Sequence, residues 1–280
     1  NVASLAYKIS TARKYDDELT KHLCVAGLLH DIGHFPLSHS VEGYLSKKLN
    51  VDHHALGNFI IDGEFPQLND LHTILKNNVD ISFIKSLLEK EVGKEVGGDI
   101  FSSQFNIDTI DGIYQSGLFI GYELFNKDEL INEAFIKSND SIDFKILDQF
   151  WESKNFIYNQ FIHTDFSLFV DNIGELFFKK NKNHLDFNDL LSVEKSWHKK
   201  FFFMKLFKNL DSSTLLSSYK GKDFYLPKEI NDNEQHFYKK RKYAIKKDEF
   251  SLCNRYIYIK NIEKFKKFSD NIPTENLCLF

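Results

Sequence analysis

Apolar residues three and four positions apart recur along most of the chain, which is the pattern of amphipathic helices. Residue types at the ends of these helices predict where they begin and stop. Thr20 is expected to cap the helix that begins there, and Gly33 and Pro36 are expected to end it. The predicted helices cover residues 2–15, 20–32, 39–49, 53–61, 69–92 (one or two helices), 104–117, 144–180 and 190–210. We expect residues 93–98 to form a loop, because glycine flanks this segment on both sides.

Two short segments depart from helical spacing. Residues 224–226 and 256–259 are aromatic and β-branched, which favours strands. A polar stretch rich in Asn and Lys at 179–186 is the best candidate for a domain boundary. The sequence therefore predicts a mainly α fold, with one helical domain over residues 1–180. A mostly helical accessory lobe with a few short strands is predicted over residues 181–280.

Composition excludes some classes of protein. The chain has 280 residues, of which 42% are hydrophobic, so it can bury a sizeable core. A net charge of −4 does not indicate non-specific binding to nucleic acid. Apolar runs such as residues 201–204 are too short to cross a bilayer, and no signal peptide is visible. The three widely spaced cysteines form no CxxC pair. These features predict a cytoplasmic protein with no membrane partner.

Histidines are concentrated near the start of the chain. Six of the eleven fall between His22 and His54. Neutral imidazole is the commonest side-chain metal ligand, and it also titrates near neutral pH. The cluster therefore indicates a metal site or an acid–base site.

The centre of this cluster is the pair His30 and Asp31. An apolar helix leads up to the pair and would carry it to a buried helix end, beside the turn at Gly33. A buried ionised carboxylate is costly unless it is paired or bound to a metal. Adjacent residues at a helix end can both reach one ion. Nitrogen and carboxylate ligands suit a divalent metal such as Mn, Fe, Zn or Mg.

The run LLHDIGHFPLSH, followed by Glu42, resembles the HD superfamily of phosphohydrolases, and specifically its deoxynucleoside triphosphate triphosphohydrolase-like branch. The resemblance covers residues 1–180 well and the remainder loosely. It implies an HD-domain helical bundle, a divalent metal cofactor and hydrolysis of a phosphate ester. It also implies assembly into a homo-oligomer.

The resemblance implies a set of metal ligands. His30 and Asp31 correspond to two of them, and Asp108 corresponds to the distant aspartate, although the alternative of a simple helix-start carboxylate stays open. Asp111 is expected to form structural hydrogen bonds. A further histidine ligand of the family would precede Asn1 by about three residues. His22 is expected to be an exposed residue of a helix's first turn and no substitute for it.

The resemblance also implies catalytic residues. His39 corresponds to a histidine that faces the scissile phosphate, and Glu42 is placed one turn later to orient it. His53 corresponds to a second phosphate-facing histidine, with a capping or surface role as the alternative. His34 is expected to line the site. His54 is expected to be an exposed neighbour.

In this branch, three residues that follow the distant aspartate contact the nucleotide, and this chain has other residue types at those three positions. After Asp108 the branch usually has a basic residue, then a Tyr, then an Asp. Here Thr109, Gly112 and Ser116 stand at those positions. We therefore expect metal chemistry without the usual selection for deoxyribose. Replacements from a later helix are sought among Lys154, Tyr158 and Gln160, and His163 is either structural or pocket-lining.

Two functions follow from the sequence. The first is a metal-dependent phosphohydrolase that acts on a nucleotide (dNTP-like) or another phosphate ester. The alternative is a non-catalytic nucleotide-binding HD module with a regulatory or assembly role.

Overall fold

The computed structural model describes residues 1–103, 105–138 and 141–162, the single residues 178 and 191, and the segments 225–229 and 256–260. The chain forms two compact units. The first unit comprises residues 1–33, 53–158 and 238–253, and the second comprises residues 34–52, 159–237 and 254–280. The boundary predicted near residue 180 lies outside the described residues and stays a prediction.

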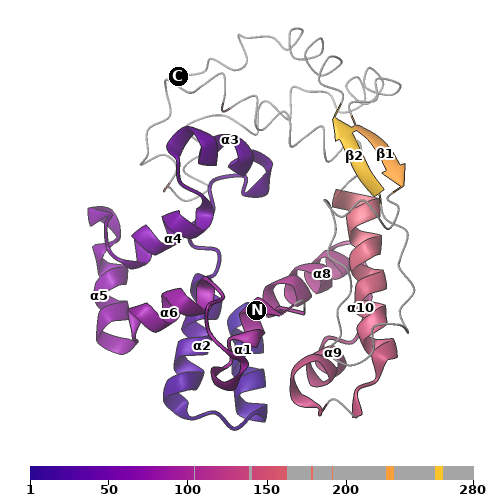
Figure 1. The fold of residues 1–280 in the computed structure, drawn as a ribbon, viewed down its shortest axis with the longest axis horizontal. Helices are drawn as coiled ribbons and strands as arrows, with labels where there is room; N and C mark the ends of the chain where they lie inside the picture. The colour runs from indigo at the N-terminus through magenta and orange to yellow at the C-terminus, as the bar shows by residue number, and fades with distance from the viewer. Residues whose placement is uncertain are drawn as a thin grey trace. The chain divides into compact units, whose positions relative to one another are not determined.

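The described part of the first unit is helical (Figure 1), as the sequence predicts. Its helices are α1 (Val2–Ala12), α2 (Asp17–Leu29), α4 (His53–Ile61), α5 (Asn69–Asn78), α6 (Ile81–Leu88), α7 (Asp99–Ser102), α8 (Ile107–Phe119), α9 (Lys127–Ile131) and α10 (Phe144–Ile157). Short 3-10 turns at Pro66–Leu68 and Lys94–Val96 and a π-helical turn at Asn132–Ile136 connect some of them. The region 69–92 thus contains two helices, and the predicted loop at 93–98 contains one of the 3-10 turns.

Helices α1 and α2 pack closely against each other. Leu5 and Ile9 of α1 and Leu23 and Ala26 of α2 are buried in the common core. At Gly27 a Cβ atom would lie 2.9 Å from the Cα atom of Ala3, so only glycine allows this approach. The close contact holds the last turn of α2, which leads to His30, against the first turn of α1.

The start of α2 corrects the prediction for Thr20. The side chain of Asp16 caps the helix by accepting a hydrogen bond of 2.7 Å from the backbone N–H of Leu19. Asp17 and Glu18 follow in the first turn, where carboxylates interact favourably with the helix dipole. The helix therefore begins at these three acidic residues and not at Thr20.

His22 is buried, and the prediction that it is exposed was wrong. Only 6% of the residue is accessible. Its Nδ1–H donates to the carbonyl of Glu18 at 2.7 Å, and its Nε2 accepts from the N–H of Asp80 at 2.8 Å. The ring of Phe83 packs edge-on against it. The reason is tertiary, because α6 packs on this face of α2.

Aromatic side chains join α10 to the start of α8. The ring of Phe105 lies 5.4 Å from that of Phe150 and 5.7 Å from that of Trp151, and Phe125 packs edge-on against Phe150. The helix predicted over 144–180 ends its α-helical part at Ile157 and continues as a π-helical turn, η5 (Tyr158–Ile162). Most of its remainder lies outside the described residues.

The described part of the second unit contains α3 (His39–Leu49) and two strands. Val41 and Leu45 are the buried residues of α3. Strand β1 (Tyr225–Glu229) pairs antiparallel with β2 (Tyr256–Lys260), with Tyr225 opposite Lys260. Both strands lie where the sequence predicts them. The helix predicted over 190–210 falls on residues that are not described, and none of the described helices is long and apolar enough to cross a membrane.

Candidate metal centre

The turn after α2 presents His30 and Asp31. The helix ends at Leu29, which is buried, and His30 is its C-terminal cap residue. Two residues after Asp31, Gly33 lies directly against the first turn of α4. A Cβ atom at Gly33 would overlap the carbonyl oxygen of His53 and the backbone nitrogen of Gly57. The glycine is therefore required for this turn to sit beside α4.

His30, Asp31 and Asp108 converge in the first unit. The Nε2 atom of His30 lies 3.2 Å from Oδ2 of Asp31 and 3.4 Å from Oδ1 of Asp108. Asp108 is in the first turn of α8, whose N-terminal cap is Asn106. The His30 side chain is 21% exposed, whereas those of Asp31 and Asp108 are 58% and 60% exposed. The structure thus joins the three predicted ligands at a surface-accessible point.

A hydrogen bond to the backbone orients the His30 ring. Its Nδ1–H donates to the carbonyl of Gly27 at 3.0 Å, which leaves Nε2 directed at the two carboxylates. Burial of the ring lowers its pKa, but hydrogen bonds and charge attraction from Asp108 and Asp31 outweigh burial and raise the pKa of His30 to about 10. A positive charge at this position is therefore strongly favoured.

The donor geometry fits a divalent cation. One nitrogen and two carboxylate oxygens lie within 4.8 Å of one another. Ligands about 2.1 Å from a common ion and at right angles to each other are about 3 Å apart. The distances from His30 Nε2 to Asp31 and Asp108 are close to that value. The backbone hydrogen bond on the opposite ring nitrogen is the usual arrangement of a histidine that binds a metal.

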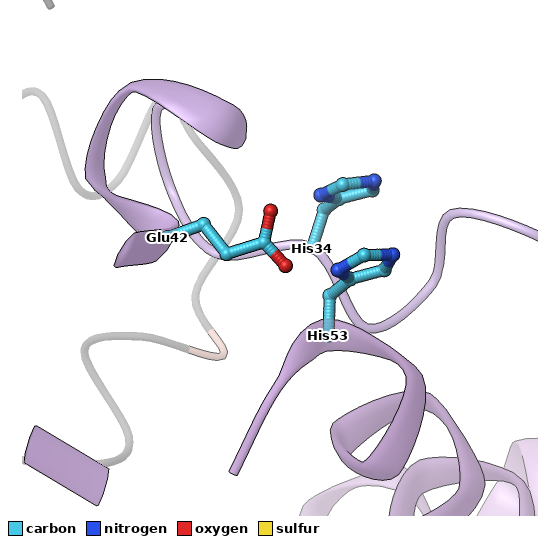
Figure 2. Close-up of side chains that lie close together, drawn as sticks. All are labelled: His34, Glu42 and His53. Atoms are coloured by element: carbon cyan, nitrogen blue, oxygen red, sulfur yellow. The ribbon is translucent and has the colours of Figure 1, made fainter. Parts of the chain in front are cut away.

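A second group of predicted residues lies in the second unit. His39, at the start of α3, places its Nδ1 atom 3.1 Å from Oε2 of Glu42. The ring of His34 packs edge-on against that of His39, with 4.8 Å between centroids. Figure 2 shows the carboxylate of Glu42 turned towards His34. The contact between Glu42 and the imidazole of His39 is the one through which the sequence analysis expects Glu42 to orient this ring.

The backbone before α3 is unusual. Leu37 and Ser38 have φ values of 66° and 44°, in the left-handed region that non-glycine residues rarely adopt. Such conformations cost of the order of 1–3 kcal/mol each and persist where the surroundings impose them. Here the turn places His39 at the first position of α3, one helical turn before Glu42.

His53 is the first residue of α4, and its ring lies 4.0 Å from that of His54. His53 is partly buried and His54 is exposed, as predicted for the latter. The carbonyl of His53 lies against the turn at Gly33, so the start of α4 lies close to the turn that carries His30 and Asp31 within the first unit. No residue type or spacing in the sequence revealed this backbone contact.

The residues around Asp108 agree with the sequence analysis in two respects. Asp111 is buried and accepts hydrogen bonds from Lys127 and Gln115 at 3.4 Å, which is a structural role. A Cβ atom at Gly112 would meet nothing within 4 Å in the part of the chain that the structure describes, so the space beside it is open there. The side chain of Gln160 and the whole of His163 lie outside the described residues.

Two of the suggested replacement residues are Lys154, which lies in α10, and Tyr158, the first residue of η5. The Nζ atom of Lys154 lies 5.3 Å from the ring centroid of Trp151 and 5.7 Å from that of Tyr158. Burial and the negative charge of Asp108 both raise the pKa of Tyr158. Tyr158 therefore lies within the electrostatic reach of Asp108.

Comparison with known families gives a match in the first part of the chain. Residues 1–107 match the HD domain, which is the domain of a superfamily of metal-dependent phosphohydrolases. The match includes His30 and Asp31 and ends one residue before Asp108. The position of Asp108 beside His30 therefore comes from the structure.

Two similar proteins are known by name. The chain is 26% identical over 202 residues to "Uncharacterized protein MG461 homolog" of Mycoplasma pneumoniae, which covers 64% of this chain and 47% of that protein. It is 33% identical over 137 residues to "Putative HD domain-containing protein L394" of Acanthamoeba polyphaga mimivirus, which covers 46% of this chain and 29% of that protein. The chain thus spans about half of the first relative and less than a third of the second.

Proposed function

We propose that the protein is a metal-dependent phosphohydrolase that acts on a nucleotide, dNTP-like in kind, or on another phosphate ester. The observation that carries this proposal is the convergence of His30, Asp31 and Asp108. The HD-domain match over residues 1–107 supports it independently of the geometry.

In this proposal His30, Asp31 and Asp108 hold the divalent cation, whose identity among Mn, Fe, Zn and Mg is open. When bound, the ion polarises phosphoryl oxygens and lowers the pKa of a water molecule. The carbonyl of Gly27 keeps Nε2 of His30 directed at the ion through the hydrogen bond on Nδ1. The exposed carboxylates leave room for substrate oxygens beside the ion.

Proton transfer is assigned to His39. Glu42 accepts a hydrogen bond from Nδ1 of His39, which raises the basicity of Nε2 and directs that nitrogen away from the carboxylate. A general acid–base group of this kind contributes about 10²–10⁴-fold to the rate. His34 and His53 are proposed to bind phosphoryl oxygens. The alternative roles of His53, capping or a surface position, predict no effect of its removal on turnover.

The proposal also concerns which sugar a nucleotide substrate can carry. Thr109, Gly112 and Ser116 provide no cation, aromatic ring or carboxylate on α8. We therefore propose that the site discriminates weakly between sugars and that ribose and deoxyribose substrates are both accepted.

Assembly into a homo-oligomer is also proposed, and sedimentation of the purified protein tests it.

The test is release of phosphate, pyrophosphate and triphosphate from a panel of nucleotides and p-nitrophenyl phosphate, with Mn²⁺ added. We expect metal-dependent release that the Asp108→Ala variant loses and that the Asp70→Ala variant, changed at an exposed position on α5, retains. Nucleotide binding without release from any substrate would instead support the non-catalytic HD module.

A further inference from the structure

The exposed face of α8 carries an open strip beside the metal centre. Asp108 and Gly112 are one helical turn apart and both are exposed. A Cβ atom at Gly112 would meet no described residue within 4 Å. The sequence of α8 contains no lysine or arginine. Any cation that meets a substrate along this strip must therefore come from another element.

The charge balance of the metal centre favours such a cation. A divalent ion bound by neutral His30 and ionised Asp31 and Asp108 forms a set with no net charge. A phosphate ester adds at least one negative charge, and a polyphosphate adds several. Partly desolvated negative charge is expensive unless a positive group faces it.

Helix α10 is fixed beside the start of α8 by ring contacts. Phe105, three residues before Asp108, packs against Phe150 and Trp151. Phe150 is fully buried, and 8% of Trp151 is accessible. Figure 1 shows α10 running past α8. These contacts attach Phe150 and Trp151 to the segment that leads into Asp108, and the next turn of α10 follows directly after them.

That next turn carries a lysine between two aromatic rings. Lys154 lies over the rings of Trp151 and Tyr158, which are three residues before it and four residues after it on one face of the helix. Attraction between an ammonium group and aromatic faces orients the charge. The influence of Asp108 on the pKa of Tyr158 is consistent with this placement.

We propose that Lys154 binds anionic oxygens of the substrate's phosphate groups beside the metal centre, and that Tyr158 is a positioning residue that holds Lys154 there. This inference rests on the proposed function. It assigns substrate affinity to α10, because Thr109, Gly112 and Ser116 of α8 carry no positive charge. Lys154 takes no part in bond breaking, so its removal weakens binding and leaves turnover nearly unchanged.

The first experiment replaces the charge. Lys154→Gln is compared with Lys154→Arg, which keeps the charge, and with Lys145→Gln, which removes an exposed lysine at the other end of α10. A lost charge-assisted hydrogen bond lowers affinity about ten- to a hundredfold. We expect the KM of Lys154→Gln to rise by that factor while kcat changes less than about threefold. Lys154→Arg is expected to retain most of the affinity, and Lys145→Gln all of it.

The second experiment separates positioning from folding. Tyr158→Phe keeps the ring under Lys154, whereas Tyr158→Ala removes it. We expect Tyr158→Ala to raise KM several-fold with kcat retained, and Tyr158→Phe to restore the KM of the parent protein. Equal KM values for the two variants would contradict the positioning role. A fall in kcat alone would contradict it as well.

A binding measurement distinguishes failure of this inference from failure of the proposed function. Calorimetric titration with inorganic tripolyphosphate, in the presence of Mn²⁺, is run on the parent protein and on Lys154→Gln. Weaker binding by Lys154→Gln supports the inference even if no substrate is hydrolysed. A different outcome overturns this inference but not the proposed function: the parent protein hydrolyses substrate, and Lys154→Gln shows the same KM and the same tripolyphosphate binding as the parent protein. A parent protein that neither binds tripolyphosphate nor releases phosphate overturns both.

Discussion

The Nε2 atom of His30 lies 3.4 Å from the Oδ1 atom of Asp108, although His30 follows the end of α2 and Asp108 lies in α8, far away in the sequence. Asp31 completes the group from the position next to His30. Because two of the three side chains are carboxylates, the group attracts a cation whether that cation is a proton on His30 or a metal ion.

Removal of one carboxylate should abolish metal binding without unfolding the protein. Asp108→Asn keeps the size of the side chain but removes its charge. Because Asp108 is mostly exposed, we expect the melting temperature of the metal-free protein to change little. Metal content after dialysis, measured by elemental analysis, should fall at least tenfold. Retention of the full metal content by Asp108→Asn would exclude this residue as a ligand.

The charge on His30 should depend on pH in a defined way. Its pKa is raised to about 10 in the metal-free fold, above the usual value of 6.5. A raised pKa stabilises the folded state fully below pH 6.5, and this contribution is lost as the pH rises from there through about 10. NMR titration of the imidazole in chelator-treated protein measures this pKa, and Asp108→Asn should lower it. A ring that titrates near 6.5 in both proteins would contradict the prediction.

The same proton should compete with the metal. A metal ion binds the neutral imidazole, so binding must release the proton from His30. We expect metal affinity to increase with pH up to about 10. Proton release is measured by calorimetry in buffers of different ionisation enthalpy. An affinity for the ion that is independent of pH would show that His30 is not a ligand.

His22 should stabilise the fold and not the chemistry. Its ring connects α2 to the N–H of Asp80 at the start of α6, and His22→Ala leaves that N–H and the Glu18 carbonyl without this partner. Loss of buried hydrogen bonds of this kind costs about 1–3 kcal/mol each. Urea unfolding should show a loss of about 2–4 kcal/mol. His54→Ala, at an exposed position, is the control and should change stability by less than about 0.5 kcal/mol.

Two glycine substitutions should act in opposite directions. Gly33→Ala places a methyl group against the backbone of α4, so it should destabilise the first unit and disturb His30 and Asp31. Gly112→Ala adds a methyl group in open space within α8 and should stabilise the helix by about 0.5–1 kcal/mol. Thermal unfolding of both variants measures this. A stabilised Gly33→Ala would contradict the close approach of the turn to α4.

Local sequence pattern predicted most of the helices in the described region. It succeeded where one face is buried, as along α8, where Ile107, Ile110 and Ile113 enter the core. It failed at Thr20, because three adjacent acidic residues contain a better cap. It also failed at His22, because burial there depends on α6, which is distant in the sequence.

The site was predicted through a motif and a resemblance, and spacing alone was insufficient. His30 and Asp31 are adjacent in the sequence, so they lie close together whatever the tertiary structure. The proximity of Asp108 depends on how α8 packs, and periodicity gives no information about that. The contact between Gly33 and the start of α4 involves backbone atoms only and leaves no residue pattern except the glycine itself.

The exposure of Asp31 and Asp108 has a kinetic consequence. Both carboxylates are more than half accessible, so an ion can enter or leave without any opening of the core. Exchange should therefore be limited by breaking ligand bonds and not by unfolding. At equilibrium the ion in the proposed site would then be set by the relative concentrations and affinities of the metals in the surrounding medium, with copper and zinc the strongest competitors for nitrogen and oxygen donors.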